Sequence, residues 1–133
     1  MSQENVDISY AAVAALNRDG IKGFLAYCDP QVEWITPPDF LEDRVFNGHE
    51  GVTRAIALFG EQLDGFRVDI ERVIDVDEDR VVVLLLQRGR IKGSSHTLDG
   101  PLGVATQFHD GRATRFEVYF SWEDALKAVG LEQ

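Results

Sequence analysis

The chain has 133 residues, of which 23 are acidic and 13 are lysine or arginine, so its formal net charge is −10 at pH 7. This length suits a single domain. Binding to nucleic acid depends on clustered lysine and arginine that displace counterions from phosphates, so the excess of acid argues against a nucleic-acid partner. It argues equally against binding to an anionic membrane surface.

Cysteine content and the first residues predict a cytoplasmic protein. Cys28 is the single cysteine, so no internal disulfide can form and no oxidising compartment is indicated. The first ten residues lack the basic and apolar regions of a secretory signal. The longest apolar run, residues 81–86, is far shorter than the 18 or more residues of a membrane span.

The first third of the chain is patterned for helices. A helix that Ser2 can cap and that ends at Gly20 places four apolar residues on one face: Val6, Tyr10, Val13 and Leu16. A short second helix ends before Pro30, with apolar residues at i, i+3, i+4 and i+7: Ile21, Phe24, Leu25 and Cys28. This spacing puts Cys28 in the core as an inert thiol.

A strand over residues 31–36 and a loop over residues 37–47 come next in the prediction. Gly48 then begins a third helix with an apolar stripe: Val52, Ile56 and Phe59. From Gly65 onward the pattern has period two, because Phe66, Val68 and Ile70 alternate with charged residues. This alternation predicts a strand with one solvated face.

The remaining pattern predicts three further strands and a last helix. The strands cover residues 80–91, residues 97–109 with a bend at Gly100-Pro101 or Gly103, and residues 113–121. Asp110-Gly111 predicts a tight hairpin turn. Ser121 can cap the short helix, which ends near Gly130. The order of helices and then antiparallel strands predicts an α+β domain.

Motifs for metal, nucleotide and nucleophilic chemistry are missing from the sequence. His49-Glu50 begins like the helix of zinc proteases, but Thr53 stands where the second histidine is needed. The three histidines and the single cysteine have no metal-ligand spacing, and the chain has no glycine-rich phosphate loop. We therefore expect neither a metal nor another cofactor.

Several short segments occur in a specific order. They are AALNRDG at 14–20, FLAYCDP at 24–30, VEW at 32–34, NGHEGV at 47–52, DGR at 110–112 and EVYF at 117–120. Over about residues 6–131 they resemble the SnoaL-like branch of the nuclear transport factor 2-like superfamily. The resemblance implies one α+β, cone-like domain over residues 1–133. Its N-terminal helices would pack in a strongly curved, mainly antiparallel sheet that encloses a pocket, and many relatives are homodimers through the outer face of that sheet.

The residues that carry catalysis in known relatives are replaced in this chain. The tyrosine, carboxylate base and protonated acid of the ketosteroid isomerases fall at Ala12, Thr36 and Val104. In the acid–arginine–acid relay of limonene epoxide hydrolase, Arg88 matches the arginine, but Arg90 and Val118 take the places of the acids. Neither replacement can act as a general base. The resemblance therefore supports the fold more strongly than any known reaction.

Strand alternation predicts an apolar and aromatic pocket with arginines near its open end. The predicted lining is Trp34, Thr36, Arg88, Arg90, Val104, Thr106, Phe108, Phe116, Val118 and Phe120. Arg88 either meets a carboxylate or enolate of a ligand or pairs with a neighbouring acid at the sheet edge. Asp39, in the loop after the first strand, is a speculative general base and otherwise an exposed loop acid.

The leading hypothesis is a domain that binds a small, mostly apolar molecule, with or without a carbonyl or carboxylate, and that needs no cofactor. A cofactor-free isomerase, cyclase or hydrolase is one alternative. The other is a homodimeric interaction module with a vestigial pocket, for which Glu117 and Tyr119 would face outward from the sheet.

Overall fold

The computed structural model describes residues 3–36, 45–61 and 63–131, which form one mixed sheet and four helices. The helices are α1 (Gln3–Asp19), α2 (Ile21–Leu25), α3 (Gly48–Gly60) and α4 (Trp122–Ala128). The strands are β1 (Cys28–Ile35), β2 (Val45–Asn47), β3 (Leu63–Asp75), β4 (Arg80–Ile91), β5 (Thr97–His109) and β6 (Arg112–Tyr119). No helix in these three segments is both long and apolar enough to cross a membrane.

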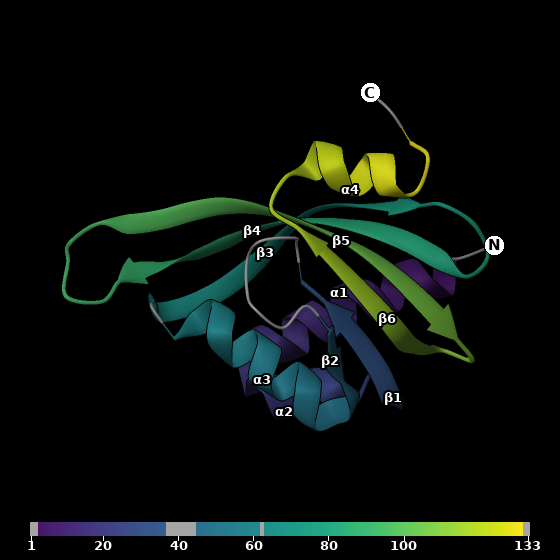
Figure 1. Cartoon of the computed structure of the whole chain (residues 1–133), viewed down its shortest axis with the longest axis horizontal. Helices are drawn as coiled ribbons and strands as arrows, with labels where there is room; N and C mark the ends of the chain where they lie inside the picture. The colour runs from purple at the N-terminus through teal and green to yellow at the C-terminus, as the bar shows by residue number, and fades with distance from the viewer. Residues whose placement is uncertain (1–2, 37–44, 62, 132–133) are drawn as a thin grey trace.

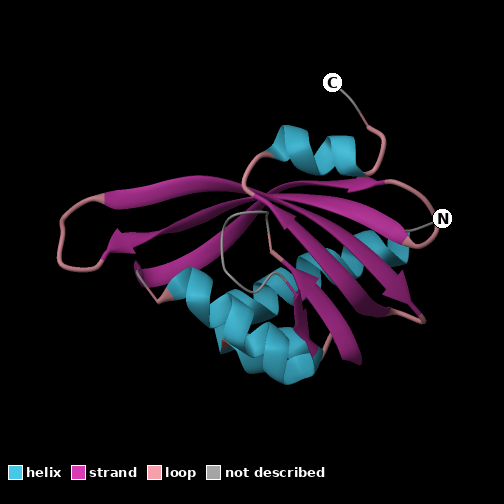
Figure 2. Ribbon diagram, in the orientation of Figure 1, coloured by secondary structure: helices cyan, strands magenta, loops and turns pink. Residues whose placement is uncertain are grey.

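The six strands lie in the order β2-β1-β6-β5-β4-β3. All neighbours are antiparallel except β1 and β6, which are parallel. Helices α1, α2 and α3 lie on one side of the twisted sheet and α4 lies on the other (Figure 1 and Figure 2). This arrangement confirms the predicted α+β fold with N-terminal helices packed against a mainly antiparallel sheet.

The long hairpins follow the sequence pattern closely. β4 and β5 have the predicted bounds, and the β5–β6 turn uses positive φ at both Asp110 (51°) and Gly111 (79°), as a two-residue type I′ turn requires. The pairing of β5 with β4 continues without a shift through Gly100 and Gly103, so β5 has no bulge at the positions where a bend was predicted. Gly103 instead lets α4 approach closely, since a Cβ there would lie 2.5 Å from the Cβ of Ala125.

The predicted apolar face of the first helix is partly wrong. Tyr10 is 48% exposed, whereas Asn5, Ser9, Ala12 and Ala15 are buried. Small side chains allow α1 to lie close to the sheet, and the buried polar ones have partners. The Ser9 hydroxyl donates to the Asn5 carbonyl at 2.9 Å, and the Asn5 amide donates to the Glu78 carbonyl at 3.0 Å. Ser2 and the Phe59 side chain lie outside the described residues.

The segment around Cys28 differs from the prediction in secondary structure but not in burial. α2 ends at Leu25, so Cys28 is the first residue of β1, and its side chain is 2% exposed. The short strand β2 was not predicted, because three residues are too few to show alternation. His49 lies in the first turn of α3, which begins at Gly48 as expected, and its Nε2 lies 3.0 Å from the Cys28 carbonyl oxygen.

Helix α4 covers the outer face of the sheet where β4 and β5 cross it. The Ser121 hydroxyl accepts a hydrogen bond from the Asp124 amide at 3.2 Å, which confirms the predicted N-cap. Ala125 and Leu126 pack against Val82 and Leu84 of β4. β4 is therefore covered on both faces, by α4 on the outer face and by the N-terminal helices on the inner face.

Candidate functional site

A cavity of about 90 Å³ lies between the inner face of the sheet and the N-terminal helices. Helix α1 contributes one wall through Ile8, Ser9, Ala12, Val13 and Leu16. The opposite wall consists of alternate residues of three strands: Val83, Leu85, Leu102, Val104, Thr106, Phe108, Phe116 and Val118. The two walls come from segments far apart in the sequence, so the cavity exists only in the folded chain.

Strand alternation explains which side chains form the wall. In β4, Val83 and Leu85 face the cavity, while Val82 and Leu84 point to α4 on the other side. β4 and β5 pair without a register shift, so this alternation holds along the full length of β4. The sheet therefore separates a closed outer core from an inner core that contains a void.

Three aromatic rings form one end of the cavity. The centre of the Phe116 ring lies 5.5 Å from that of Phe24 and 5.4 Å from that of Trp34, and the rings are tilted against each other. These distances are typical of favourable aromatic pairs. The rings come from β6, α2 and β1, so this end of the cavity depends on the parallel pairing of β1 with β6.

The lining is almost entirely apolar and, among the described residues, contains no charged side chain. The Ser9 hydroxyl proton is used by the Asn5 carbonyl. The Cys28 thiol points to the Phe24 carbonyl oxygen at 3.7 Å, and burial raises the pKa of this thiol to about 12. Cys28 is therefore neutral at physiological pH and unsuited to nucleophilic chemistry.

Several residues that the sequence analysis assigned to the pocket do lie around this cavity: Trp34, Val104, Thr106, Phe108, Phe116 and Val118. Thr36 is fully buried but does not line it, and Phe120 follows the end of β6 with 39% of its surface exposed. Ile8 and Ser9 also line the cavity but were not predicted to do so, because the expected face of the first helix ran through Tyr10. Ile8, Ala12 and Ala15 follow the i, i+4 and i+7 spacing of one helical face, and Ser9 lies next to Ile8 on it, so this face would have predicted their contribution.

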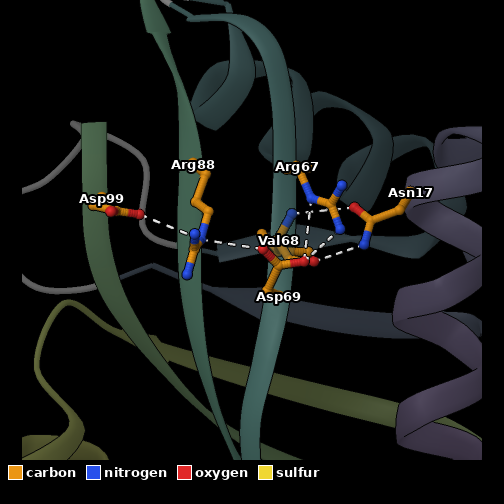
Figure 3. A network of polar contacts seen from close by, with 6 residues as sticks. All are labelled: Asn17, Arg67, Val68, Asp69, Arg88 and Asp99. Carbon is orange, nitrogen blue, oxygen red and sulfur yellow. Dashed lines mark hydrogen bonds and ion pairs between the residues drawn. The ribbon is translucent and has the colours of Figure 1, made fainter. Parts of the chain in front are cut away.

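Arg88 and Arg90 lie on the face of the sheet opposite the cavity, which corrects the expectation that they face inward. Arg88 Nε lies 3.1 Å from Asp69 Oδ2 and 3.3 Å from Asp99 Oδ1, across three neighbouring strands (Figure 3). Arg90 Nη2 lies 3.1 Å from Asp64 Oδ2. The unbroken register of β4 gives both arginines the orientation of Val82 and Leu84. Arg88 therefore pairs with neighbouring acids, which was the second of its two predicted roles, and β4 contributes no cation to the cavity.

The positions that the resemblance assigns to catalysis carry no acid or base in this cavity. Ala12, Val104 and Val118 line it and are apolar. Asp39, the speculative base, lies outside the described residues. Within residues 3–36, 45–61 and 63–131, no group of three histidine, cysteine, aspartate or glutamate side chains could hold a metal ion. The described lining therefore supplies no carboxylate or imidazole for proton transfer.

Comparison with solved structures identifies close matches in fold. TerC, co-crystallised with polyporic acid, is 25% identical with a TM-score of 0.76, over 96% of this chain and 98% of TerC. Rv0760c from Mycobacterium tuberculosis, in complex with estradiol-17β-hemisuccinate, is 16% identical with a TM-score of 0.71, over 89% of this chain and 95% of that protein.

A nuclear transport factor 2-like protein of unknown function from Burkholderia pseudomallei K96243 is 21% identical with a TM-score of 0.76, over 96% of this chain and 98% of that protein. Comparison with curated protein sequences gives no significant match. The family described as the SnoaL-like domain matches residues 10–122, which is most of the chain and includes all of the cavity lining except Ile8 and Ser9. The chain therefore belongs to the SnoaL-like domain family, with the nuclear transport factor 2-like fold.

Proposed function

We propose that the chain binds a small, mostly apolar molecule in the cavity between α1 and the sheet. The observation that carries the proposal is an internal cavity with an apolar lining on the concave side of the sheet. The crystal structures of TerC with polyporic acid and of Rv0760c with an estradiol ester support it, because relatives of the same fold have been crystallised with small molecules.

The volume of the cavity limits the size of the molecule that can bind in it. The volume of about 90 Å³ is smaller than the roughly 150 Å³ of an engineered apolar cavity that binds benzene. A guest of about one ring therefore fits after small movements of the wall, and a larger one requires the rings of Phe24 and Phe116 to turn. An unfilled apolar cavity of this volume costs about 2 kcal/mol of stability, and a bound guest would recover part of that energy.

The proposal is for binding, and it leaves the reaction unassigned. The described lining has no charged group, so nothing there would activate water or abstract a proton. The alternative is a cofactor-free isomerase, cyclase or hydrolase that uses Asp39 as its base. That alternative requires Asp39→Asn to abolish turnover without changing the affinity for the ligand.

Toluene and a cavity-filling variant test the binding proposal. Ala12→Leu places three additional carbons in the cavity, whereas Ala14→Leu makes the same change at an exposed position of α1. Toluene at about ten times its Kd should raise the Tm of the wild type and of Ala14→Leu by about 4 °C. Ala12→Leu should show little rise. An equal rise in all three proteins would show that toluene binds elsewhere and would remove the proposal.

The homodimer implied by the family stays a prediction, and it is independent of the cavity. Glu117 and Tyr119 lie on the outer face of β6, where the Tyr119 hydroxyl donates to the Glu117 carboxylate at 3.1 Å. A homodimer through this face would persist at low micromolar concentration in sedimentation velocity. A monomer under those conditions would exclude the interaction-module alternative.

A further inference from the structure

Thr106 is a polar residue in the apolar wall of the cavity. It lies on β5, lines the cavity and is 3% exposed. The Thr106 hydroxyl takes part in none of the side-chain hydrogen bonds found within residues 3–36, 45–61 and 63–131. It is also not among the fully enclosed polar atoms that lack a partner, which fits a hydroxyl that opens onto the cavity lined by this residue. A buried hydroxyl without a partner lowers stability, because it gives up its hydrogen bonds to water and gains none in return.

The neighbours of Thr106 within the sheet offer nothing polar in compensation. Its partners across the strands are Val81 on β4 and Phe116 on β6, and its neighbours on the same face of β5 are Val104 and Phe108. All four are buried and apolar. Valine has the same shape as threonine and would suit this position without the hydroxyl, so packing alone gives no reason for a threonine here.

The other short polar side chains of the lining already have partners. The Ser9 hydroxyl donates to the Asn5 carbonyl, and the Cys28 thiol is directed at the Phe24 carbonyl. A water molecule would need two to four polar partners to be held next to Thr106, and the four apolar neighbours supply none. The Thr106 hydroxyl is therefore a hydrogen-bonding group that a guest in the cavity can use.

We propose that Thr106 is the polar recognition point for the ligand, which is an uncharged molecule of about one ring with a single hydroxyl or carbonyl oxygen that bonds to Thr106 Oγ1. This inference rests on the proposed binding function and adds the chemical class. A carboxylate is excluded as that polar group, because the described lining has no cation and Arg88 lies on the opposite face of the sheet. The apolar remainder of the molecule contacts the rings of Phe24 and Phe116.

Phenol and toluene are matched probes for this hydrogen bond, since a hydroxyl replaces a methyl group on the same ring. Their dissociation constants are measured by calorimetry or ligand-observed NMR for the wild type, Thr106→Val and Thr106→Ser. Thr106→Val should weaken phenol binding about fivefold to tenfold, the effect of one neutral hydrogen bond, and should change toluene binding less than twofold. Thr106→Ser keeps the hydroxyl and should retain the wild-type preference for phenol.

The outcomes separate this inference from the proposed function. If Thr106→Val leaves the ratio of the two dissociation constants unchanged, or if the wild type binds toluene and not phenol, the cavity still binds a guest but Thr106 does not recognise it. If the wild type binds neither probe, both proposals fail. The free proteins give a second check, because Thr106→Val should unfold at the same or a higher temperature than the wild type. A marked fall in Tm would mean that the hydroxyl has a structural partner, and it would overturn the inference.

Discussion

The two faces of β4 have the same kind of residues but different packing. On the outer face, Val82 and Leu84 meet α4 so closely that a Cβ on the neighbouring Gly103 would lie 2.5 Å from the Cβ of Ala125. On the inner face, Val83 and Leu85 border a cavity of about 90 Å³. The void is therefore not caused by a shortage of apolar side chains. Small α1 side chains such as Ser9 and Ala12 line the cavity, so part of the space between this helix and the sheet stays unfilled.

The largest expected effect is a difference between two adjacent leucines of β4. Leu84 and Leu85 are equally buried, but Leu84 contacts α4 and Leu85 borders the cavity. Leu84→Ala should lower the free energy of unfolding by about 4 kcal/mol, because it creates a new void in a filled core. Leu85→Ala should cost only about 2 kcal/mol, because that side chain already lacks contacts on one side. Urea unfolding of the two variants measures both values.

The second half of this prediction concerns ligand size. Leu85→Ala should enlarge the cavity and improve binding of a guest larger than toluene, such as naphthalene, whereas Leu84→Ala should not. Equal losses of stability together with equal binding would mean that the inner face is as well packed as the outer one.

The next effect tests how tightly the outer face is closed. Gly103→Ala should destabilise the fold by about 2 kcal/mol, because the new methyl group collides with α4. Gly100→Ala is the matched control on the same strand, where a Cβ would meet the Gln87 side chain at an ordinary 3.5 Å. Chemical denaturation should show no loss for the control. Similar stability of the two variants would show that α4 moves away easily.

The same comparison shows what the sequence could predict. Alternation along β5 and β6 put Val104, Thr106 and Phe116 on one face of the sheet, because each lies between polar or small residues of opposite orientation, and all three line the cavity. Residues 81–86 are all apolar, so they contain no alternation from which the orientation of Arg88 could be counted.

Two further features of the inner face depend on packing that a residue pattern does not contain. Counting apolar residues on the first helix favoured Tyr10, whereas the helix lies on Asn5, Ser9 and other small side chains that allow close approach. The cavity itself depends on how completely the side chains of α1 and of the sheet fill the space between them. The family resemblance could predict that a pocket exists, but not its volume or the absence of charge in its described lining.

Burial of Cys28 on the inner face predicts an effect of about 1.4 kcal/mol at alkaline pH. Its pKa rises from 9.0 to about 12 on folding because burial disfavours the thiolate. The unfolded chain loses this proton first, so the contribution to stability is fully present below pH 9 and is lost as the pH rises from 9 to 12. Between pH 7 and 10 the free energy of unfolding of the wild type should fall by about 1.4 kcal/mol more than that of Cys28→Ala. Parallel pH profiles for the two proteins would show that the thiol reaches solvent.

The smallest effect is expected from the ion pairs on the outer face beyond α4. Asp69 accepts from Arg67 at 2.6 Å and lies 3.1 Å from Arg88 Nε, whose N–H is not aligned with it as a hydrogen bond (Figure 3). Asp69 is 31% exposed and both arginines more so, which limits such pairs to below about 1 kcal/mol. Asp69→Asn should therefore reduce the free energy of unfolding by less than that in dilute buffer, and by even less in 1 M NaCl. Binding of toluene should not change, because these charges lie on the face of the sheet that does not border the cavity. A loss above about 2 kcal/mol, or a weakened guest, would mean that the charged residues at this end of β3 and β4 hold the inner wall in place, and that the two faces of the sheet are coupled rather than independent.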